Sequence, residues 1–150
     1  MLPNDRLPTK KGLQLSSAVP NYEVYIQGDQ SALEQAIEKL LGFTINYCDQ
    51  DSKIQVSLSA ESVNGVAYAQ LEISSLGLDV AVFDLTQIFL PFYKSSEGNI
   101  RNSGLQLSIA KEITELHKGE ISAEADSEKG ICFRMKLPAT RIGEELVPTP

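Results

Sequence analysis

The sequence predicts an α+β fold, a two-layer sandwich in which helices cover one face of a sheet. Two observations indicate this: two pairs of alternating strands are each joined by a short turn, and a long segment with helical spacing precedes each pair. The chain has 150 residues, of which 42% are hydrophobic and 22% charged, enough for one domain with a core. We expect that domain at residues 12–139, between a flexible leader (1–11) and a flexible tail (140–150).

The first elements are two short strands and a long helix. Leu13 and Leu15 alternate with polar neighbours, which predicts an edge strand, and residues 22–26 predict a second strand. Asp29 is the expected N-cap of the helix, which ends near Tyr47, because its carboxylate can accept hydrogen bonds from free amides. The apolar face of this helix consists of Leu33, Ile37, Leu40, Leu41 and Thr44.

A hairpin follows the first helix. Ile54, Val56 and Leu58 alternate with polar residues, and residues 67–74 form the expected partner strand. The Asn-Gly pair at 64–65 predicts the turn between them, because both residue types tolerate a positive φ.

The second half repeats the pattern with a short helix and a loop added. Residues 84–89 predict a short helix that Pro91 ends, and residues 94–102 a polar loop. A long helix and the final hairpin (120–125 and 131–137) follow, and Gly119 is expected at a left-handed helix end. The apolar stripe expected on this helix is Leu105, Ile109, Ile113 and Leu116.

Composition excludes several classes of function. A formal net charge of -7 argues against a nucleic-acid partner, which requires a basic surface. No run approaches the roughly 18 apolar residues of a membrane span, and the N-terminus lacks an apolar signal core. We therefore expect a cytoplasmic protein without membrane contact, in which Cys48 and Cys132 are reduced, although a disulfide between them stays open.

Several ordered blocks resemble the ATP-binding domain of sensor histidine kinases. Residues 87–94 (Gln-Ile-Phe-Leu-Pro-Phe-Tyr-Lys) are similar to its phenylalanine block, and residues 103–111 to its second glycine block. Residues 29–41 and 109–121 are similar to its helices, and residues 130–138 to its last strand. The resemblance, over residues 13–138, implies the Bergerat fold of the GHKL superfamily: a mixed sheet of about five strands under three helices, with ATP beneath a flexible lid.

The family's metal and adenine positions carry other residue types here. In the asparagine block, the residue that supports catalysis corresponds to Lys39 and the magnesium ligand to Phe43, whose ring offers a cation no oxygen. In the first glycine block, Ser75 stands at the aspartate that accepts the adenine amino group. Gly77 is retained in that block, and Asp79 replaces its second glycine.

The second glycine block and the lid are also altered. Glycines in this block let backbone amides approach the triphosphate, and Gly104 is retained while Gln106 replaces another glycine. Lys94 matches the basic residue after the phenylalanine block, and the lid that follows it is short. Ser103, at the start of the second long helix, is interpreted as an N-cap rather than as a phosphate ligand.

These substitutions predict a degenerate histidine-kinase ATPase domain with no catalytic residue, no metal ligand and no bound cofactor. Its function would be regulation or protein docking, with a response regulator or another kinase as the partner. The alternative is a divergent but active domain that binds ATP with magnesium and phosphorylates a histidine on another domain. A third possibility is a different small ligand in the old pocket, which Phe43, Leu76 and Leu78 make more apolar.

Single residues favour structural interpretations. His117 is the only histidine, and Lys118-Gly119 follow it, unlike the acidic residue that follows a phosphoacceptor histidine, so we interpret it as a helix-terminal residue. Aromatic residues near the lid are expected to anchor that region in the core: Phe83, Phe89, Phe92 and Tyr93.

Overall fold

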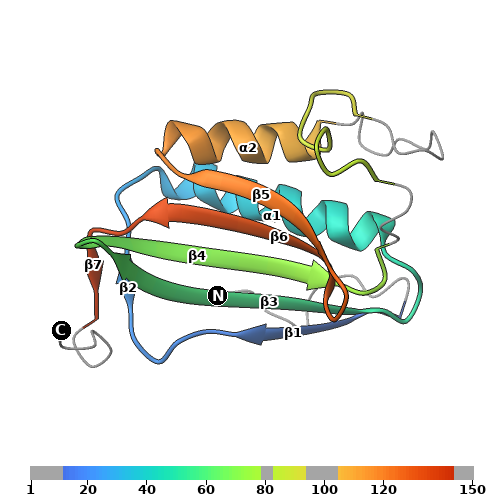
Figure 1. The fold of residues 1–150 in the computed structure, drawn as a ribbon, viewed down its shortest axis with the longest axis horizontal. Coiled ribbons are helices and arrows are strands. Elements are labelled where there is room, and N and C mark those ends of the chain that lie inside the picture. Colours follow the sequence, from blue (N-terminus) through green and yellow to red (C-terminus); the bar gives the residue numbers. More distant parts are fainter. Residues whose placement is uncertain (1–11, 79–82, 94–104, 144–150) are drawn as a thin grey trace.

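The computed structural model describes residues 12–78, 83–93 and 105–143, and these form two layers (Figure 1). One layer is a five-stranded sheet in the order β1-β3-β4-β6-β5, and α1 and α2 lie side by side on one of its faces. The elements are β1 (Gln14–Ala18), β2 (Val24–Tyr25), α1 (Gln30–Tyr47), β3 (Lys53–Val63), β4 (Val66–Ser75), α2 (Gln106–Leu116), β5 (Glu120–Asp126), β6 (Gly130–Pro138) and β7 (Arg141–Ile142).

The main sheet is mixed, as expected. β1 pairs with β3 in parallel, and all the other pairs in this sheet are antiparallel. β2 and β7 form a separate two-stranded antiparallel sheet. β7 lies in the segment for which we expected a flexible tail, so that expectation is wrong for residues 141–142. A backbone hydrogen bond directly after β7, from Gly143 N–H to Glu23 O at 2.6 Å, also holds this segment, and a hydrophobic pattern does not reveal such bonds.

The hairpin and the first helix form where the sequence predicted them. Asn64 and Gly65 have φ values of 52° and 81°, the left-handed conformation that a two-residue hairpin turn requires. Asp29 is the N-cap of α1, and its Oδ1 accepts a hydrogen bond from the amide of Ala32 at 3.1 Å. The helix ends at Tyr47, as expected, so both its limits were readable from local chemistry.

The core lies between the helix layer and the inner face of the sheet. Its largest fully buried side chains include Phe133, Ile73 and Ile54 from the sheet and Leu40 from α1. The cysteines, Cys48 and Cys132, are both buried and free. Within the described residues, no helix is long and apolar enough to cross a membrane.

The expected apolar stripe of α2 is only partly correct. Ile113 is buried, but Leu116 is 76% exposed. The residues buried on this helix are Leu107, Ala110, Ile113 and Thr114. The sequence pattern selected the largest apolar side chains, whereas the fully buried positions of α2 are the small residues Ala110 and Thr114.

The expected short helix at 84–89 is not a helix. Residues 85–89 form successive turns, in which amides such as Gln87 N and Leu90 N donate to the carbonyl three residues earlier. The described residues therefore contain two α-helices rather than three. Phe83 is buried as expected and Phe89 packs against the core, but Phe92 is 63% exposed, so its expected core position is wrong.

The left-handed end of α2 is displaced by one residue from the prediction. Lys118, not Gly119, has the positive φ, at 63°. The amide of Gly119 then donates to Thr114 O at 2.9 Å, which closes the helix. A glycine is needed at 119 for another reason: a Cβ there would overlap the carbonyl oxygen of Lys136 on β6.

Candidate functional site

Phe43 is part of the hydrophobic core rather than of an open pocket. It lies in the C-terminal half of α1 and is 7% exposed. Its ring meets that of Phe133 on β6 edge to face, with centroids 5.7 Å apart and planes at 88°. Tyr47 and Phe83 complete the contacts of the ring, with centroids at 4.5 Å and 5.6 Å. This position therefore holds a packed aromatic ring and offers no oxygen to a metal ion.

We call this group the aromatic cluster; its members are Phe43, Tyr47, Phe83, Phe89 and Phe133. It joins α1, the turn segment 83–93 and β6 into one packed unit. The sequence placed Phe83 and Phe89 in the core but did not reveal that Phe133 would meet Phe43. This contact depends on tertiary packing. In the sequence, Phe133 is only one apolar residue of an alternating strand, so nothing there indicates its partner.

Lys39 lies one helical turn before Phe43 and is half-buried. Within the described residues it forms no ion pair or hydrogen bond. A lysine presents a point charge and three donors but no acceptor, so it does not replace an asparagine's paired donor and acceptor.

Ser75 and Gly77 lie where β4 ends, and local contacts account for both. Ser75 is 2% exposed, and its Oγ accepts a hydrogen bond from the amide of Gly77 at 3.1 Å. A Cβ at Gly77 would overlap the side chain of Ser52, and the carbonyl of Gly77 accepts from the amide of Asp49 at 3.0 Å. The serine hydroxyl is thus engaged with its own turn, and the glycine is required by packing.

Gln106 begins α2 and reaches across to α1. A Cβ added at Gly42 would lie 2.9 Å from Nε2 of Gln106, so this amide packs against the backbone of α1 next to Phe43. Gln106 therefore lies beside Gly42, the residue that precedes Phe43 in the chain. The remaining expected positions, Asp79, Lys94 and Gly104, lie outside the described residues, as do the lid and Ser103.

The described residues contain no group of three or more histidine, cysteine, aspartate or glutamate side chains placed to hold a metal ion. The charged side chains that interact strongly lie instead on the outer face of the sheet. There Arg134 Nε contacts Glu72 at 2.8 Å, and this hydrogen bond raises the pKa of the Arg134 guanidinium. Burial raises the pKa of the Cys132 thiol, and the Glu72 carboxylate raises it further, so this cysteine is a poor nucleophile.

His117 lies at the C-terminal end of α2, as predicted. Its Nδ1 is 2.8 Å from the carbonyl oxygen of Ile113, and its Nε2 accepts a hydrogen bond from the amide of Asp29 at 3.0 Å. Both ring nitrogens are therefore engaged with backbone groups, as in a structural histidine.

A family match identifies this architecture. The family described as "Histidine kinase-, DNA gyrase B-, and HSP90-like ATPase" matches residues 28–141, which include both helices and β3 to β6. The chain belongs to this family. The GHKL resemblance drawn from the motifs is thereby confirmed.

Relatives within the family are sensor kinases. The chain is 27% identical over 129 residues to the sensor histidine kinase RppB of Synechocystis, covering 84% of this chain and 28% of RppB. It is 30% identical over 112 residues to the sensor protein CiaH of Streptococcus pneumoniae, covering 73% of this chain and 24% of CiaH. The chain thus spans about a quarter of the length of these relatives.

Solved structures show the same fold. The mycobacterial sensor histidine kinase MprB matches with a TM-score of 0.68 at 21% identity, covering 85% of this chain and 84% of that chain. Full-length ShkA, solved in complex with AMPPNP, matches with a TM-score of 0.72 at 20% identity, covering 91% of this chain and 28% of that chain. These likenesses confirm the α+β Bergerat fold with its mixed five-stranded sheet.

Proposed function

We propose that this chain is a histidine-kinase ATPase domain that has lost nucleotide binding and acts as a regulatory or docking module in two-component signalling. The observation that carries the proposal is the position of Phe43. The family's magnesium-coordinating asparagine corresponds to this residue, and here it is a 7% exposed ring packed against Phe133. A magnesium ion bridging ATP phosphates requires an oxygen at this place, and a buried phenylalanine excludes one.

The surrounding positions support the same conclusion. Ser75 replaces the adenine-binding aspartate, and its hydroxyl is engaged by the amide of Gly77. Loss of one charge-assisted hydrogen bond costs about 1.5–3 kcal/mol, which is one to two decades of affinity. Gln106 stands at a position where the family has a glycine, and its side chain occupies space beside Gly42. Each change lowers the affinity for ATP, and together they remove both the metal and the base contacts.

An exposed apolar surface on the turn segment supports a docking role. Leu90 and Phe92 are 54% and 63% exposed, and they lie within three residues of each other. Phe92 also has a φ of 61°, a strained conformation for a bulky residue that tends to occur at functional positions. Sensor kinases act with response regulators, so the partner that we propose is a receiver domain or the corresponding segment of another kinase.

Thermal unfolding with nucleotide tests the loss of ATP binding. The melting temperature is measured with and without millimolar ATP or ADP and magnesium, with an ATP-binding histidine-kinase domain as the positive control. A ligand at 100 times its dissociation constant stabilises by about 2.7 kcal/mol, which is readily seen as a shift. We expect the control to shift and this chain not to shift; a magnesium-dependent shift contradicts the proposal.

The docking role has its own test. A receiver domain titrated into isotope-labelled protein should shift amide resonances of residues 88–93, and the change Leu90→Ser with Phe92→Ser should abolish those shifts. Because both side chains are exposed, the variant should fold normally. Shifts that persist in the variant, or that fall elsewhere, would place the docking surface on another part of the domain.

The second candidate is an active ATP- and magnesium-binding domain that phosphorylates a histidine supplied by another domain. The retained family residues Lys94 and Gly104 favour it, together with the fold match to ShkA, which was solved with AMPPNP. It needs a metal ligand that replaces the asparagine at position 43. The nucleotide melting experiment distinguishes the two candidates directly.

A further inference from the structure

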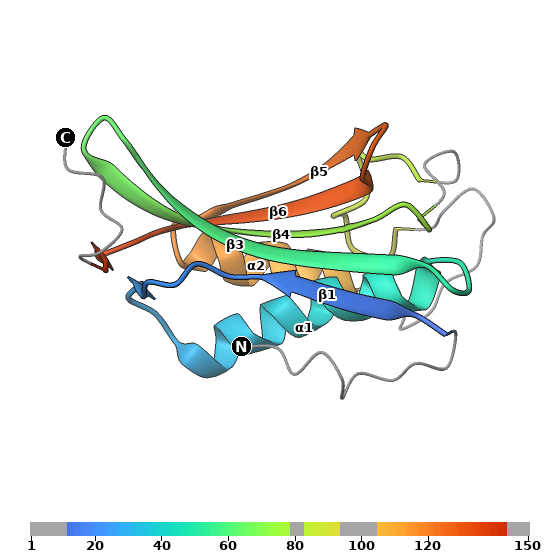
Figure 2. The same cartoon turned by 90° about the horizontal axis from the view of Figure 1, so that it is seen from below.

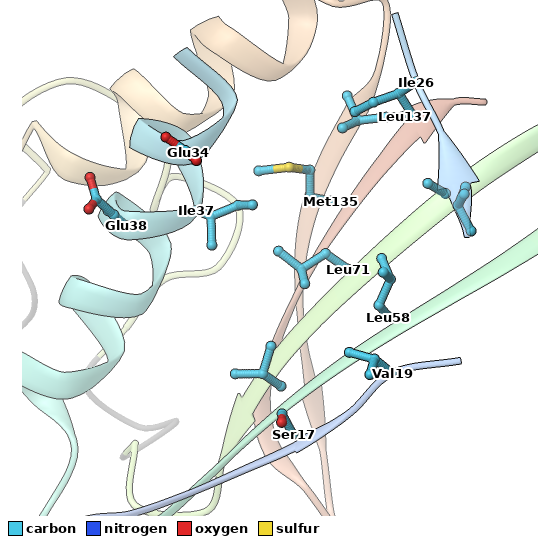
Figure 3. Close-up of a pocket in the computed structure, with 13 residues that line it drawn as sticks. Ser17, Val19, Ile26, Glu34, Ile37, Glu38, Leu58, Leu71, Met135 and Leu137 are labelled. Carbon is cyan, nitrogen blue, oxygen red and sulfur yellow. The ribbon is translucent and has the colours of Figure 1, made fainter. Parts of the chain in front are cut away.

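A cavity of about 520 Å³ lies between the N-terminal half of α1 and the inner face of the sheet. Figure 3 shows Ile37 pointing from α1 toward Leu71 on β4 and Met135 on β6. None of the described positions that correspond to the family's nucleotide site lines it. Phe43 lies further along α1, in its C-terminal half, whereas the α1 residues that line the cavity are Glu34, Ile37 and Glu38.

The shape of the sheet accounts for this opening. β3 and β4 are long strands that curve away from α1 at their hairpin end (Figure 2). Leu58 and Leu71 face each other across these strands on the same side as the buried pair Val56 and Ile73, yet both are only half-buried. The apolar inner face thus continues past the part that the helices cover. Exposed apolar surface of this extent often marks a binding site, so the opening needs an explanation.

Two carboxylates lie at the mouth of the cavity. Glu34 and Glu38 line it and are exposed, so they lie where it opens to solvent. They are one helical turn apart, a spacing at which like charges repel. Glu38 forms no hydrogen bond or ion pair within the described residues, and Glu34 accepts only a 3.3 Å hydrogen bond from Gln30. Among the described residues that line the cavity, none is a lysine or an arginine.

We propose that this cavity binds a small amphiphile with an apolar body and a cationic head group of the ammonium or guanidinium class. The apolar body would lie against Ile37, Leu58, Leu71 and Met135, where it would cover the half-buried side chains. The cationic head would lie at the mouth, where it relieves the repulsion between the two glutamates. An anionic head would face both carboxylates, so the charges select the sign of the ligand.

The size and the mostly apolar lining of the cavity favour a small molecule over a protein segment. Small-molecule sites are typically about 300–1,000 Å³ and mostly apolar, with a few polar groups that fix orientation. The lining residues come from α1, from four strands of the main sheet (β1, β3, β4 and β6), and from β2 with its flanking connections, and they converge on a single volume. The site is separate from the nucleotide positions, so its test does not depend on the outcome of the nucleotide experiment.

Methionine methyl labelling provides a direct test. The chain contains two methionines, so labelled protein gives two methyl resonances, and a Met135→Leu sample assigns the one in the cavity. The probe is n-octylammonium below its micelle concentration, compared with octan-1-ol and octanoate. The Met135 methyl should shift and saturate, and octylammonium should bind roughly fivefold more tightly than octan-1-ol, as expected for two partly exposed charge pairs. Octanoate should bind more weakly than either.

Charge variants distinguish binding of octylammonium at this cavity from a general attraction of cations to an acidic protein. The change Glu34→Gln with Glu38→Gln should remove the preference for octylammonium over octan-1-ol while octan-1-ol still binds. The matched control, Glu112→Gln with Glu115→Gln, removes the same number of negative charges from exposed positions of α2 and should keep that preference. Melting curves confirm that both variants fold.

Three results would overturn the proposal. One is a Met135 methyl that shifts with neither octylammonium nor octan-1-ol. Another is a Glu34→Gln, Glu38→Gln variant that binds octylammonium as tightly as the original chain. The third is a dimer, seen by sedimentation, that octylammonium dissociates, since this would assign the cavity to a second copy of the chain.

Discussion

The side chain of His117 connects the ends of the two helices. Its Nε2 accepts a hydrogen bond at 3.0 Å from the backbone amide of Asp29, the N-cap of α1. An amide can only donate, so Nε2 is the unprotonated nitrogen, and Nδ1–H donates to the carbonyl of Ile113 at 2.8 Å. A Cβ at Gly28 would overlap the imidazole ring, so the chain approaches this histidine closely. The contact fixes where α1 begins relative to where α2 ends.

Replacement of His117 by alanine should destabilise the fold. The amide of Asp29 would lose its side-chain acceptor but remain accessible to water, so we expect a loss of about 0.5–1.5 kcal/mol in the free energy of unfolding. Urea denaturation measures this value. Glu115→Ala, an exposed position on the same helix, is the control and should change the free energy by less than about 0.5 kcal/mol. Equal effects of the two substitutions would show that the hydrogen bond contributes nothing.

The tautomer of His117 gives a second test of the same contact. Two-bond nitrogen–proton correlation spectra at neutral pH should show Nδ1 protonated and Nε2 unprotonated, because the Asp29 amide occupies Nε2. The Nε2–H tautomer as the major form would be incompatible with the hydrogen bond from Asp29.

Phe43→Asn restores the residue type that the family uses and should harm this chain. It removes a ring from the aromatic cluster and introduces an amide without partners, which costs at least about 3 kcal/mol. For a chain of this length the melting temperature should fall by roughly 6–12 °C. Addition of ATP and magnesium should recover none of that loss.

Phe92→Asn serves as the matched control for that substitution. Phe92 is 63% exposed and has a φ of 61°, a conformation that asparagine adopts more readily than phenylalanine. Its melting temperature should therefore stay the same or rise. If Phe43→Asn proved as harmless as Phe92→Asn, the packed aromatic cluster would be contradicted.

The turn between β5 and β6 should make stability sensitive to acid. The amides of Glu128 and Lys129 donate to Oδ1 of Asp126, and these hydrogen bonds hold its pKa below the ordinary value of 3.8. Because the folded pKa is depressed, the contribution to stability is present above 3.8 and is lost as the pH falls through the folded value. Carboxyl carbon shifts of Asp126 measure this pKa. Asp126→Ala should flatten the acid limb of the stability profile, while an unchanged limb would exclude a role for this turn.

Reversion of only two positions of the nucleotide site to the family's residues should not restore ATP binding. Ser75→Asp with Phe43→Asn should bind ATP little better than the original chain, because Gln106 and Asp79 still stand at glycine positions. The fourfold reversion, which adds Gln106→Gly and Asp79→Gly, should regain measurable affinity if the protein folds. Recovery by the double variant alone would mean that the glycine positions are unimportant.

Local chemistry made much of the fold predictable. The N-cap Asp29, the Asn64-Gly65 turn and the alternating strands identify elements whose geometry depends on a few neighbouring residues. Predictions failed where tertiary packing decides the outcome. Leu116 was expected in the core and is 76% exposed, because α2 is rotated so that Ala110 and Thr114 lie on its buried face instead.

In the candidate site, too, properties of single side chains were predictable and tertiary contacts were not. The sequence could say that Phe43 offers no oxygen to a metal, since that is a property of the side chain itself. It could not say whether the ring points into an empty pocket or packs against Phe133, because that depends on the register of β6 and the position of α1. The sequence also could not predict the cavity between α1 and the sheet, because this cavity arises from the curvature of β3 and β4.

Titration calorimetry with AMPPNP and magnesium tests the central claim most directly. The account predicts no binding heat at millimolar nucleotide under conditions in which an active histidine-kinase domain binds, and no change in the Met135 or His117 resonances. A saturable, magnesium-dependent isotherm with about one nucleotide per chain would contradict it, and would establish a working ATP site despite the buried ring of Phe43.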